Sequence, residues 1–169
     1  KNRYIADVNT TATDLAIDAG IKFFDKYPEK KKEIDYLIFC TQSPDFFLPT
    51  SACLIQDKLG LRTEIGAIDI NQGCSGFVYG LSVASGLIKS QAIDSCLVVC
   101  AEGYSRYISP HDRTCRPIFS DGASAALVVD DGEGDIGPFV FATDGTFKRS
   151  PIPLLPDDLL ESLMQPLNS

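Results

Sequence analysis

The chain has 169 residues, of which 44% are hydrophobic and 22% charged, a composition typical of a globular protein large enough for one domain. Lys and Arg number 15 against 23 Asp and Glu, so the net charge is −8, and a nucleic-acid partner is not expected because its phosphates would be repelled. The apolar runs fall short of the roughly 18 residues that cross a bilayer, and the N-terminus has no signal-peptide pattern. We therefore expect a cytoplasmic protein with no membrane partner.

The first part of the chain alternates helix-like and strand-like segments. Thr11 is typical of a helix N-cap and predicts a helix over residues 12–27. Residues 35–41 are apolar and rich in β-formers, which indicates a buried strand. A second helix is expected over residues 49–59, where a proline opens it and Gly60 suits its C-terminal stop.

The following part continues the alternation. We predict strands at residues 65–70, 95–101, 123–129 and 137–142. A helix with many small residues, which favour close packing, is expected over residues 77–90. Strands separated by helices and ending in an antiparallel pair predict an α/β domain with a mixed five-stranded sheet and helices on both faces.

Cysteine usage indicates neither a zinc site nor a disulfide framework. Six cysteines form no CxxC pair, and one histidine, His111, accompanies them, so we predict no metal. Four lie in apolar stretches, such as those around Cys40, Cys96 and Cys100, and we predict that they pack in the core as reduced thiols.

Cys74 differs from the other cysteines because it follows a predicted strand and precedes a predicted helix, in the segment DINQGCSGF. This placement would aim helix N–H groups and the positive end of the helix dipole at its sulfur. Both effects favour the thiolate, which is the nucleophilic form. Gly73 and Gly76 would permit a sharp turn and leave room for a substrate. The residues alone leave open a catalytic thiol and a buried structural cysteine.

Residues 73–77 (GCSGF), placed after a strand, resemble the nucleophile turn of the β-ketoacyl-(acyl-carrier-protein) synthase III family of the thiolase superfamily. Three further segments match this family in the same order. They are residues 49–56 with the later pair 59–60 (LG), the pair 112–113 (DR) with 119–123 (FSDGA), and the pair 144–145 (DG). The resemblance implies a thiolase-like half whose first strand is missing.

The resemblance also implies roles for single residues. Cys74 would accept an acyl group from acyl-CoA, and its own N–H would supply part of the oxyanion hole. Arg113 would contact the nucleotide end of coenzyme A, Leu48 would reach into the acyl pocket of a partner subunit, and Gly76 would line the substrate side. Without the resemblance, Arg113 would be a solvated charge and Leu48 an apolar loop residue.

The family completes its site with a histidine and an asparagine from the second half of a chain about twice this length. Neither can be placed here, and His111 is predicted to be an ordinary loop residue. We therefore expect residues 1–150 to form an N-terminal thiolase-like domain, incomplete at its start, and residues 151–169 to begin the connection to an absent half. Because Lys1 is not a methionine, a piece of a longer enzyme is favoured over a natural short form.

The complete enzyme is expected to condense the acyl group on Cys74 with malonyl-acyl carrier protein, losing carbon dioxide, in fatty-acid or related lipid and polyketide synthesis. The resemblance implies a homodimer and no cofactor beyond the two thioester substrates. An acidic carrier protein would need a local basic patch, to which Arg106, Arg113 and Arg116 would contribute. The fragment alone is not expected to condense.

Three alternatives stay open at this point. Another Cys-dependent enzyme that acts on CoA esters, such as a hydroxymethylglutaryl-CoA synthase or a plant-type polyketide synthase, would share the cysteine. A non-catalytic partner or dimerisation scaffold would share the fold, although retention of Cys74 between glycines disfavours it. A cysteine hydrolase would need a histidine base, for which His111 is a weak candidate.

Overall fold

A computed structural model describes residues 3–132, 134 and 136–143 of the chain. Their sheet has four strands in the order β2-β1-β3-β4, and the first three are parallel whereas β4 runs antiparallel to β3. The strands are β1 (Tyr36–Cys40), β2 (Gly66–Ile70), β3 (Ser95–Glu102) and β4 (Gly122–Val129). The helices are α1 (Ala12–Lys26), α2 (Ser51–Lys58) and α3 (Gly76–Lys89), with 3-10 turns at Pro28–Lys32 and Tyr104–Tyr107.

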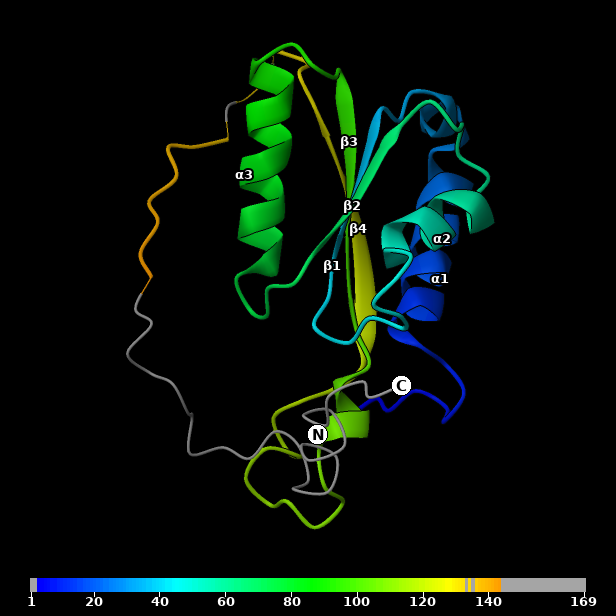
Figure 1. Cartoon of the computed structure of the whole chain (residues 1–169), viewed down its shortest axis with the longest axis vertical. Helices are drawn as coiled ribbons and strands as arrows, with labels where there is room; N and C mark the ends of the chain where they lie inside the picture. Colours follow the sequence, from blue (N-terminus) through cyan, green and yellow to red (C-terminus); the bar gives the residue numbers. More distant parts are fainter. Residues whose placement is uncertain (1–2, 133, 135, 144–169) are drawn as a thin grey trace, which may run out of the picture.

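The helices cover both faces of the sheet. Figure 1 shows α1 and α2 together on one face and α3 on the other. The alternation of side chains along β1 explains this arrangement: Leu37 and Phe39 pack toward α1 and α2, whereas Ile38 and Cys40 pack toward α3. The predicted α/β class, the mixed sheet and the helices on both faces are therefore confirmed.

The starts of α1 and α2 are stabilised in different ways. At α1, the Thr11 hydroxyl accepts from Asp14 N at 3.1 Å, and Thr11 N donates to the Asp14 carboxylate at 2.9 Å, which forms a capping box. At α2, the Asp69 carboxylate of β2 accepts from Ser51 N at 2.7 Å and from Ala52 N at 2.8 Å. A residue of the neighbouring strand therefore caps the second helix.

The fifth strand predicted at residues 137–142 does not form in the described sheet. Residues 136–143 have no strand pairing and run along the outer side of α3 (Figure 1). Pro138 has no N–H to donate to a ladder, and Gly137 has a φ of +131°. Apolar side chains of the segment instead meet α3, where the rings of Phe141 and Tyr79 lie 5.5 Å apart.

Part of the predicted organisation lies outside the described residues. Residues 144–169 are not described, so the proposed boundary near residue 150, the connection at 151–169 and the pair 144–145 stay predictions.

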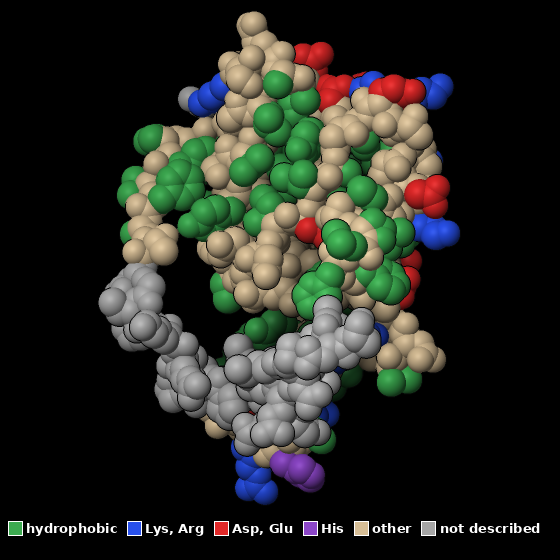
Figure 2. All heavy atoms as spheres, viewed as in Figure 1, with side chains coloured by type: hydrophobic (Ala, Val, Ile, Leu, Met, Phe, Trp, Pro, Cys, Tyr) green, Lys and Arg blue, Asp and Glu red, His purple; other side chains and the backbone are tan. Residues whose placement is uncertain are grey.

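The edges of the sheet are incompletely covered. Every residue of β2 is half-buried, and β4 has exposed residues at both of its ends. In the view of Figure 1, hydrophobic side chains gather on the surface between α3 and α2 (Figure 2). Phe46, Phe47 and Leu48, in the loop before α2, are also exposed. These apolar surfaces are candidates for contact with further protein.

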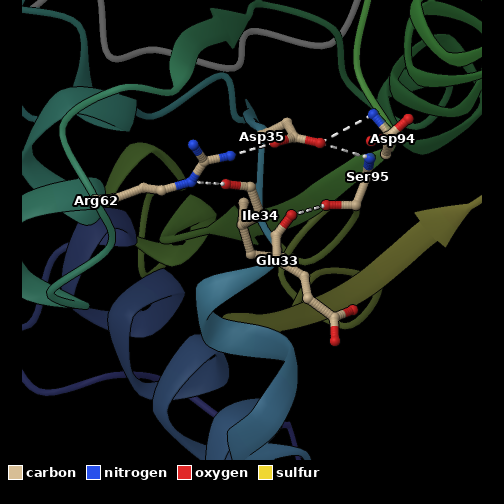
Figure 3. Close-up of polar contacts among 6 residues, drawn as sticks. All are labelled: Glu33, Ile34, Asp35, Arg62, Asp94 and Ser95. Carbon is tan, nitrogen blue, oxygen red and sulfur yellow. Dashed lines mark hydrogen bonds and ion pairs between the residues drawn. The ribbon is translucent and has the colours of Figure 1, made fainter. Parts of the chain in front are cut away.

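Asp35 joins three segments at the end of the sheet where β1 and β3 begin (Figure 3). Its carboxylate accepts from Asp94 N at 2.9 Å and from Ser95 N at 3.1 Å, and it forms an ion pair with Arg62. The Ser95 hydroxyl donates to the Glu33 carbonyl at 2.6 Å. One carboxylate therefore fixes the segments that lead into the two central strands and into β2.

We predict that Asp35→Ala lowers the free energy of unfolding by about 2 kcal/mol, because two backbone amides and a guanidinium lose their acceptor. Urea denaturation measures the change. Lys58→Ala is the matched surface control, since Lys58 lies 4.0 Å from Asp57 in an exposed pair, and its loss costs under about 1 kcal/mol. Equal losses in the two variants would contradict the role given to Asp35.

Candidate functional site

Cys74 lies in the turn between β2 and α3, at the end of the sheet where the parallel strands have their carboxyl ends. The turn is closed by Gly76 N, which donates to the Gly73 carbonyl at 2.8 Å. The Cys74 side chain is exposed, so a buried structural role is excluded. It reaches the start of α3 as predicted, two residues before the first helical residue.

A pocket of about 310 Å³ surrounds Cys74. Its lining comes from the ends of β1 and β3, the start of β4, the turn and the first residues of α3. The lining residues are Cys40, Gln72, Gly73, Cys74, Gly76, Phe77, Cys100, Ala101, Glu102, Gly122, Ala123 and Ser124. The carboxyl ends of parallel strands are the usual place for ligand sites in α/β folds.

The glycines beside Cys74 are explained by close contacts with β1 and the loop that follows it. A Cβ atom added at Gly73 would lie 2.6 Å from Gln42 Oε1, and one at Gly76 would lie 3.3 Å from Cys40 Cβ. A side chain at either position would therefore crowd this contact, and the space for a substrate expected at these glycines stays a prediction. Gly76 does line the pocket, but it is buried against Cys40, and its contact with substrate stays a prediction.

Glu102 at the end of β3 holds the loop that supports the turn. Its carboxylate accepts from Gln42 N at 2.7 Å and from the Ser43 hydroxyl at 2.7 Å. Burial raises the pKa of Glu102, although these hydrogen bonds act in the opposite direction. Burial, followed by the charges of Glu102 and Cys74, raises the pKa of the nearby Tyr104. Sequence reasoning missed Glu102, although an acid directly after an apolar strand was a visible signal.

Three cysteines line the pocket rather than one. Cys40 and Cys100 face each other across β1 and β3, and the Cys40 thiol donates to the Gly76 carbonyl at 3.2 Å. The neighbouring Cys100 thiol, together with burial, raises the pKa of Cys40, and Cys40 in turn lowers the pKa of Cys100. The predicted core packing is confirmed for Cys40 and Cys96, whereas Cys100 is half-buried and faces the pocket.

Arg113 lies in a different place from Cys74. It lines a second pocket, of about 340 Å³, together with Arg116, Asp112 and Arg3. Backbone N–H groups, led by that of Cys115, lower the pKa of Asp112. Figure 2 shows basic side chains and the histidine at the lower end of the molecule. Sequence analysis missed Arg3, because residues more than 100 positions apart gave no local signal of contact.

Arg106 does not join this basic pocket, contrary to expectation. Its guanidinium donates to the carbonyls of Val8, at 3.1 Å, and of Thr10. Arg106 therefore holds the segment that leads into α1. Its side chain lines a separate pocket beside that segment.

Leu48 and His111 lie outside the Cys74 pocket. Leu48 is 86% exposed in the loop before α2, and its neighbour Phe47 is 91% exposed. His111 is exposed in a loop, where its backbone N–H donates to the Ser109 hydroxyl at 3.3 Å. Neither side chain lines the pocket with Cys74, so the structure assigns His111 no part in the site.

Within the described part of the chain, no group of three or more His, Cys, Asp and Glu residues is arranged to hold a metal ion. The six cysteines are free. Among the same residues, no helix has the length and apolar character needed to span a membrane.

Comparison with known proteins relates residues 68–145, which include Cys74 and Arg113, to the family model of 3-oxoacyl-[acyl-carrier-protein (ACP)] synthase III. A putative 3-oxoacyl-[acyl-carrier-protein] synthase 3 of Campylobacter jejuni is 40% identical over 126 residues, which are 75% of this chain and 35% of the relative. The β-ketoacyl-[acyl-carrier-protein] synthase III of Caldanaerobacter subterraneus is 38% identical over 148 residues, which are 86% of this chain and 44% of the relative.

Solved structures give the same relation. A crystal structure of a 3-oxoacyl-(acyl-carrier-protein) synthase III matches with a TM-score of 0.81 and 47% identity, over 86% of this chain and 44% of that one. The priming β-ketosynthase of the R1128 polyketide pathway matches with a TM-score of 0.79 and 30% identity, over 86% of this chain and 43% of that one. The thiolase-like fold is therefore confirmed, and the chain spans less than half the length of these relatives.

The packing of α3 against the sheet gives a matched pair of glycine substitutions. A Cβ at Gly80 would lie 2.9 Å from Val98 Cγ1 and 3.2 Å from Cys40 Sγ, whereas one at Gly86 would meet nothing within 4 Å. We predict that Gly80→Ala lowers the free energy of unfolding by about 1–3 kcal/mol, because it overpacks the core beneath Cys74. Gly86→Ala is expected to raise it by about 0.5–1 kcal/mol, because it restricts the unfolded chain. Urea denaturation of both variants measures the two free energies of unfolding. Destabilisation by Gly86→Ala would contradict the packing argument.

Proposed function

The chain belongs to the 3-oxoacyl-[acyl-carrier-protein] synthase III family, and we propose that its Cys74 is the acyl-accepting nucleophile of a condensing enzyme. One observation carries the proposal: Cys74 is exposed in a closed turn at the start of α3 and opens into a pocket of about 310 Å³. The reaction belongs to fatty-acid or related lipid and polyketide synthesis, and the enzyme is a cytoplasmic acyltransferase.

The first step is transfer of an acyl group from acyl-CoA. The Cys74 thiolate attacks the thioester carbonyl, a new carbon–sulfur bond forms, and coenzyme A leaves as its thiolate and takes up a proton. The N-cap residue of α3, Ser75, makes no side-chain cap, and in this scheme N–H groups of the first helical turn stabilise the negative charge that develops on the carbonyl oxygen. The Cys74 N–H contributes to the oxyanion hole in this scheme.

The second step is condensation with malonyl-acyl carrier protein. Loss of carbon dioxide leaves an enolate, whose carbon attacks the acyl carbonyl and releases Cys74. The histidine and asparagine that stabilise the enolate in this family are assigned to a further part of the enzyme, since His111 lies outside the Cys74 pocket. The two thioesters are the substrates, and the scheme uses no other cofactor.

The basic pocket supports binding of the phosphorylated ends of both substrates. Arg3, Arg113 and Arg116 gather in a chain whose net charge is −8, so they form a local positive site on an acidic protein. The site holds together because the Asp121 carboxylate accepts from Ala6 N at 2.9 Å and fixes the N-terminal segment beside the loop that carries Arg113.

A homodimer fits the exposure of the loop before α2. Leu48 and Phe47 are almost fully exposed, which suits side chains that are covered by a partner subunit. The same surface is what a non-catalytic scaffold would use, and acylation of Cys74 separates the two functions. A hydrolase is disfavoured because His111 is not positioned to act as a base for Cys74.

We predict that acetyl-CoA adds a single acetyl group to the chain and that Cys74→Ser abolishes the adduct, as measured by intact mass. Cys53→Ser is the control, because Cys53 is also exposed but lies on α2 outside the pocket. The Cys53→Ser variant is expected to keep the acetyl group on Cys74. Addition of malonyl-acyl carrier protein is expected to yield no condensation product from this chain alone. Absence of an adduct, or equal labelling of Cys53, would favour the scaffold.

We predict that the double variant Arg113→Glu and Arg116→Glu weakens coenzyme A binding about tenfold or more at low salt, because the phosphates lose their attractive field. Titration calorimetry at two salt concentrations measures the affinity. Lys22→Glu with Lys58→Glu changes the net charge equally on exposed helix positions and is expected to leave the affinity within about twofold. Equal effects of the two double variants would contradict a local site.

A further inference from the structure

Cys40 and Cys100 are a pair of thiols that the proposed acyl transfer does not use. They are direct register partners on the parallel strands β1 and β3, so their side chains project from the same face of the sheet, toward α3. We infer that Cys40 and Cys100 form a reversible disulfide when the chain meets a small organic disulfide.

The spacing of the two strands permits the bond. Neighbouring strands lie about 4.8 Å apart, within the Cα separation of about 4.4–6.8 Å at which disulfides form. The two thiols belong to the same side-chain cluster between the sheet and α3, and both line the same pocket. A bond between them therefore requires rotation of side chains rather than movement of the strands.

The two thiols differ in access, and this difference sets the order of reaction. Both line the pocket of about 310 Å³ that also contains Cys74, which gives a small disulfide a route to them. Cys100 is half-buried, whereas Cys40 is 3% exposed and lies beneath the start of α3. Cys100 is therefore the first to react, and the neighbouring Cys40 also lowers the pKa of Cys100.

The exchange proceeds in two balanced steps. The Cys100 thiolate attacks one sulfur of the external disulfide, the external sulfur–sulfur bond breaks, and one small thiolate leaves and takes up a proton. Cys40 then loses its proton to solvent and attacks Cys100 Sγ, which expels the second small thiol. Two protein thiols are oxidised, and one external disulfide is reduced to two thiols.

Oxidation has a direct consequence for the turn that carries Cys74. The Cys40 thiol donates to the Gly76 carbonyl at 3.2 Å, and a disulfide has no hydrogen for this bond. Cys40 Sγ also lies 3.2 Å from where a Cβ atom added at Gly80 would be, so the sulfur packs closely against α3. A shift of the sulfur would therefore disturb the first turns of α3. The pair therefore couples thiol oxidation to the order of the turn at residues 73–77.

The test uses the chain and its Cys74→Ser variant, each incubated with excess 2-hydroxyethyl disulfide. Free thiols are then alkylated, and the protein is digested without reductant for mass spectrometry. We expect a linked pair of peptides that contain Cys40 and Cys100 in both proteins, and dithiothreitol should remove the link. Persistence of the link in Cys74→Ser makes the result independent of whether Cys74 carries acyl groups.

Matched serine variants complete the experiment. Cys100→Ser is expected to abolish the link. Cys96→Ser is expected to keep it, because Cys96 is a buried neighbour on the same strand whose pKa burial raises to about 12 and whose register partner on β1 is Tyr36. Circular dichroism confirms that each variant is folded.

Hydrogen exchange gives the second readout. In the oxidised chain, the amides of residues 73–77 are expected to exchange several-fold faster than in the reduced chain, and reduction should restore the slow rate. A stable mixed disulfide on Cys100 without internal closure, or a link from Cys74 to either cysteine, would overturn the inference. A Cys40–Cys100 link that leaves exchange unchanged would overturn its coupling to the turn.

Discussion

The close approach of α3 to β1 is the constraint on which the candidate site depends. Gly76 and Gly80 bring the helix backbone against Cys40, and a side chain at either position would meet atoms of the sheet. The Cys40 thiol completes this contact by donating to the Gly76 carbonyl. Cys74 lies two residues before the first residue of α3. The packing of these glycines against Cys40 therefore fixes the position of the Cys74 backbone beside the pocket.

Carboxylates fix the loops at both ends of the sheet by accepting backbone N–H groups. Asp35 accepts from the amides that lead into β3, Asp69 caps α2, and Glu102 accepts from the amide of Gln42. Backbone N–H dipoles neutralise part of the charge of these carboxylates, and Arg62 adds a cation only at Asp35. Part of the net charge of −8 therefore comes from carboxylates that hold loops in place rather than from groups that face a partner. The basic pocket around Arg113 is a local exception on this acidic chain.

Local patterns predicted the elements because the forces that form them are local. The Thr11 cap, the apolar run of β1 and the glycine after α2 each act within a few residues, and the observed bounds agree closely with those expected. The contacts between distant segments were not predictable in this way. Arg106 was expected in a basic patch but holds Val8 and Thr10, and residues 137–142 had strand composition but found apolar partners on α3.

Register explains why the sequence predicted one thiol of the site and missed two. Cys74 has a recognisable position between a strand and a helix, whereas Cys40 and Cys100 resembled ordinary core residues at the ends of apolar strands. Only the parallel pairing of β1 with β3 brings these two opposite each other. The buried rows of both strands end at that pair, where the core meets the pocket. A core residue at this junction can be reached by small molecules that enter the pocket. Residues deeper in the same two strands cannot be reached in this way.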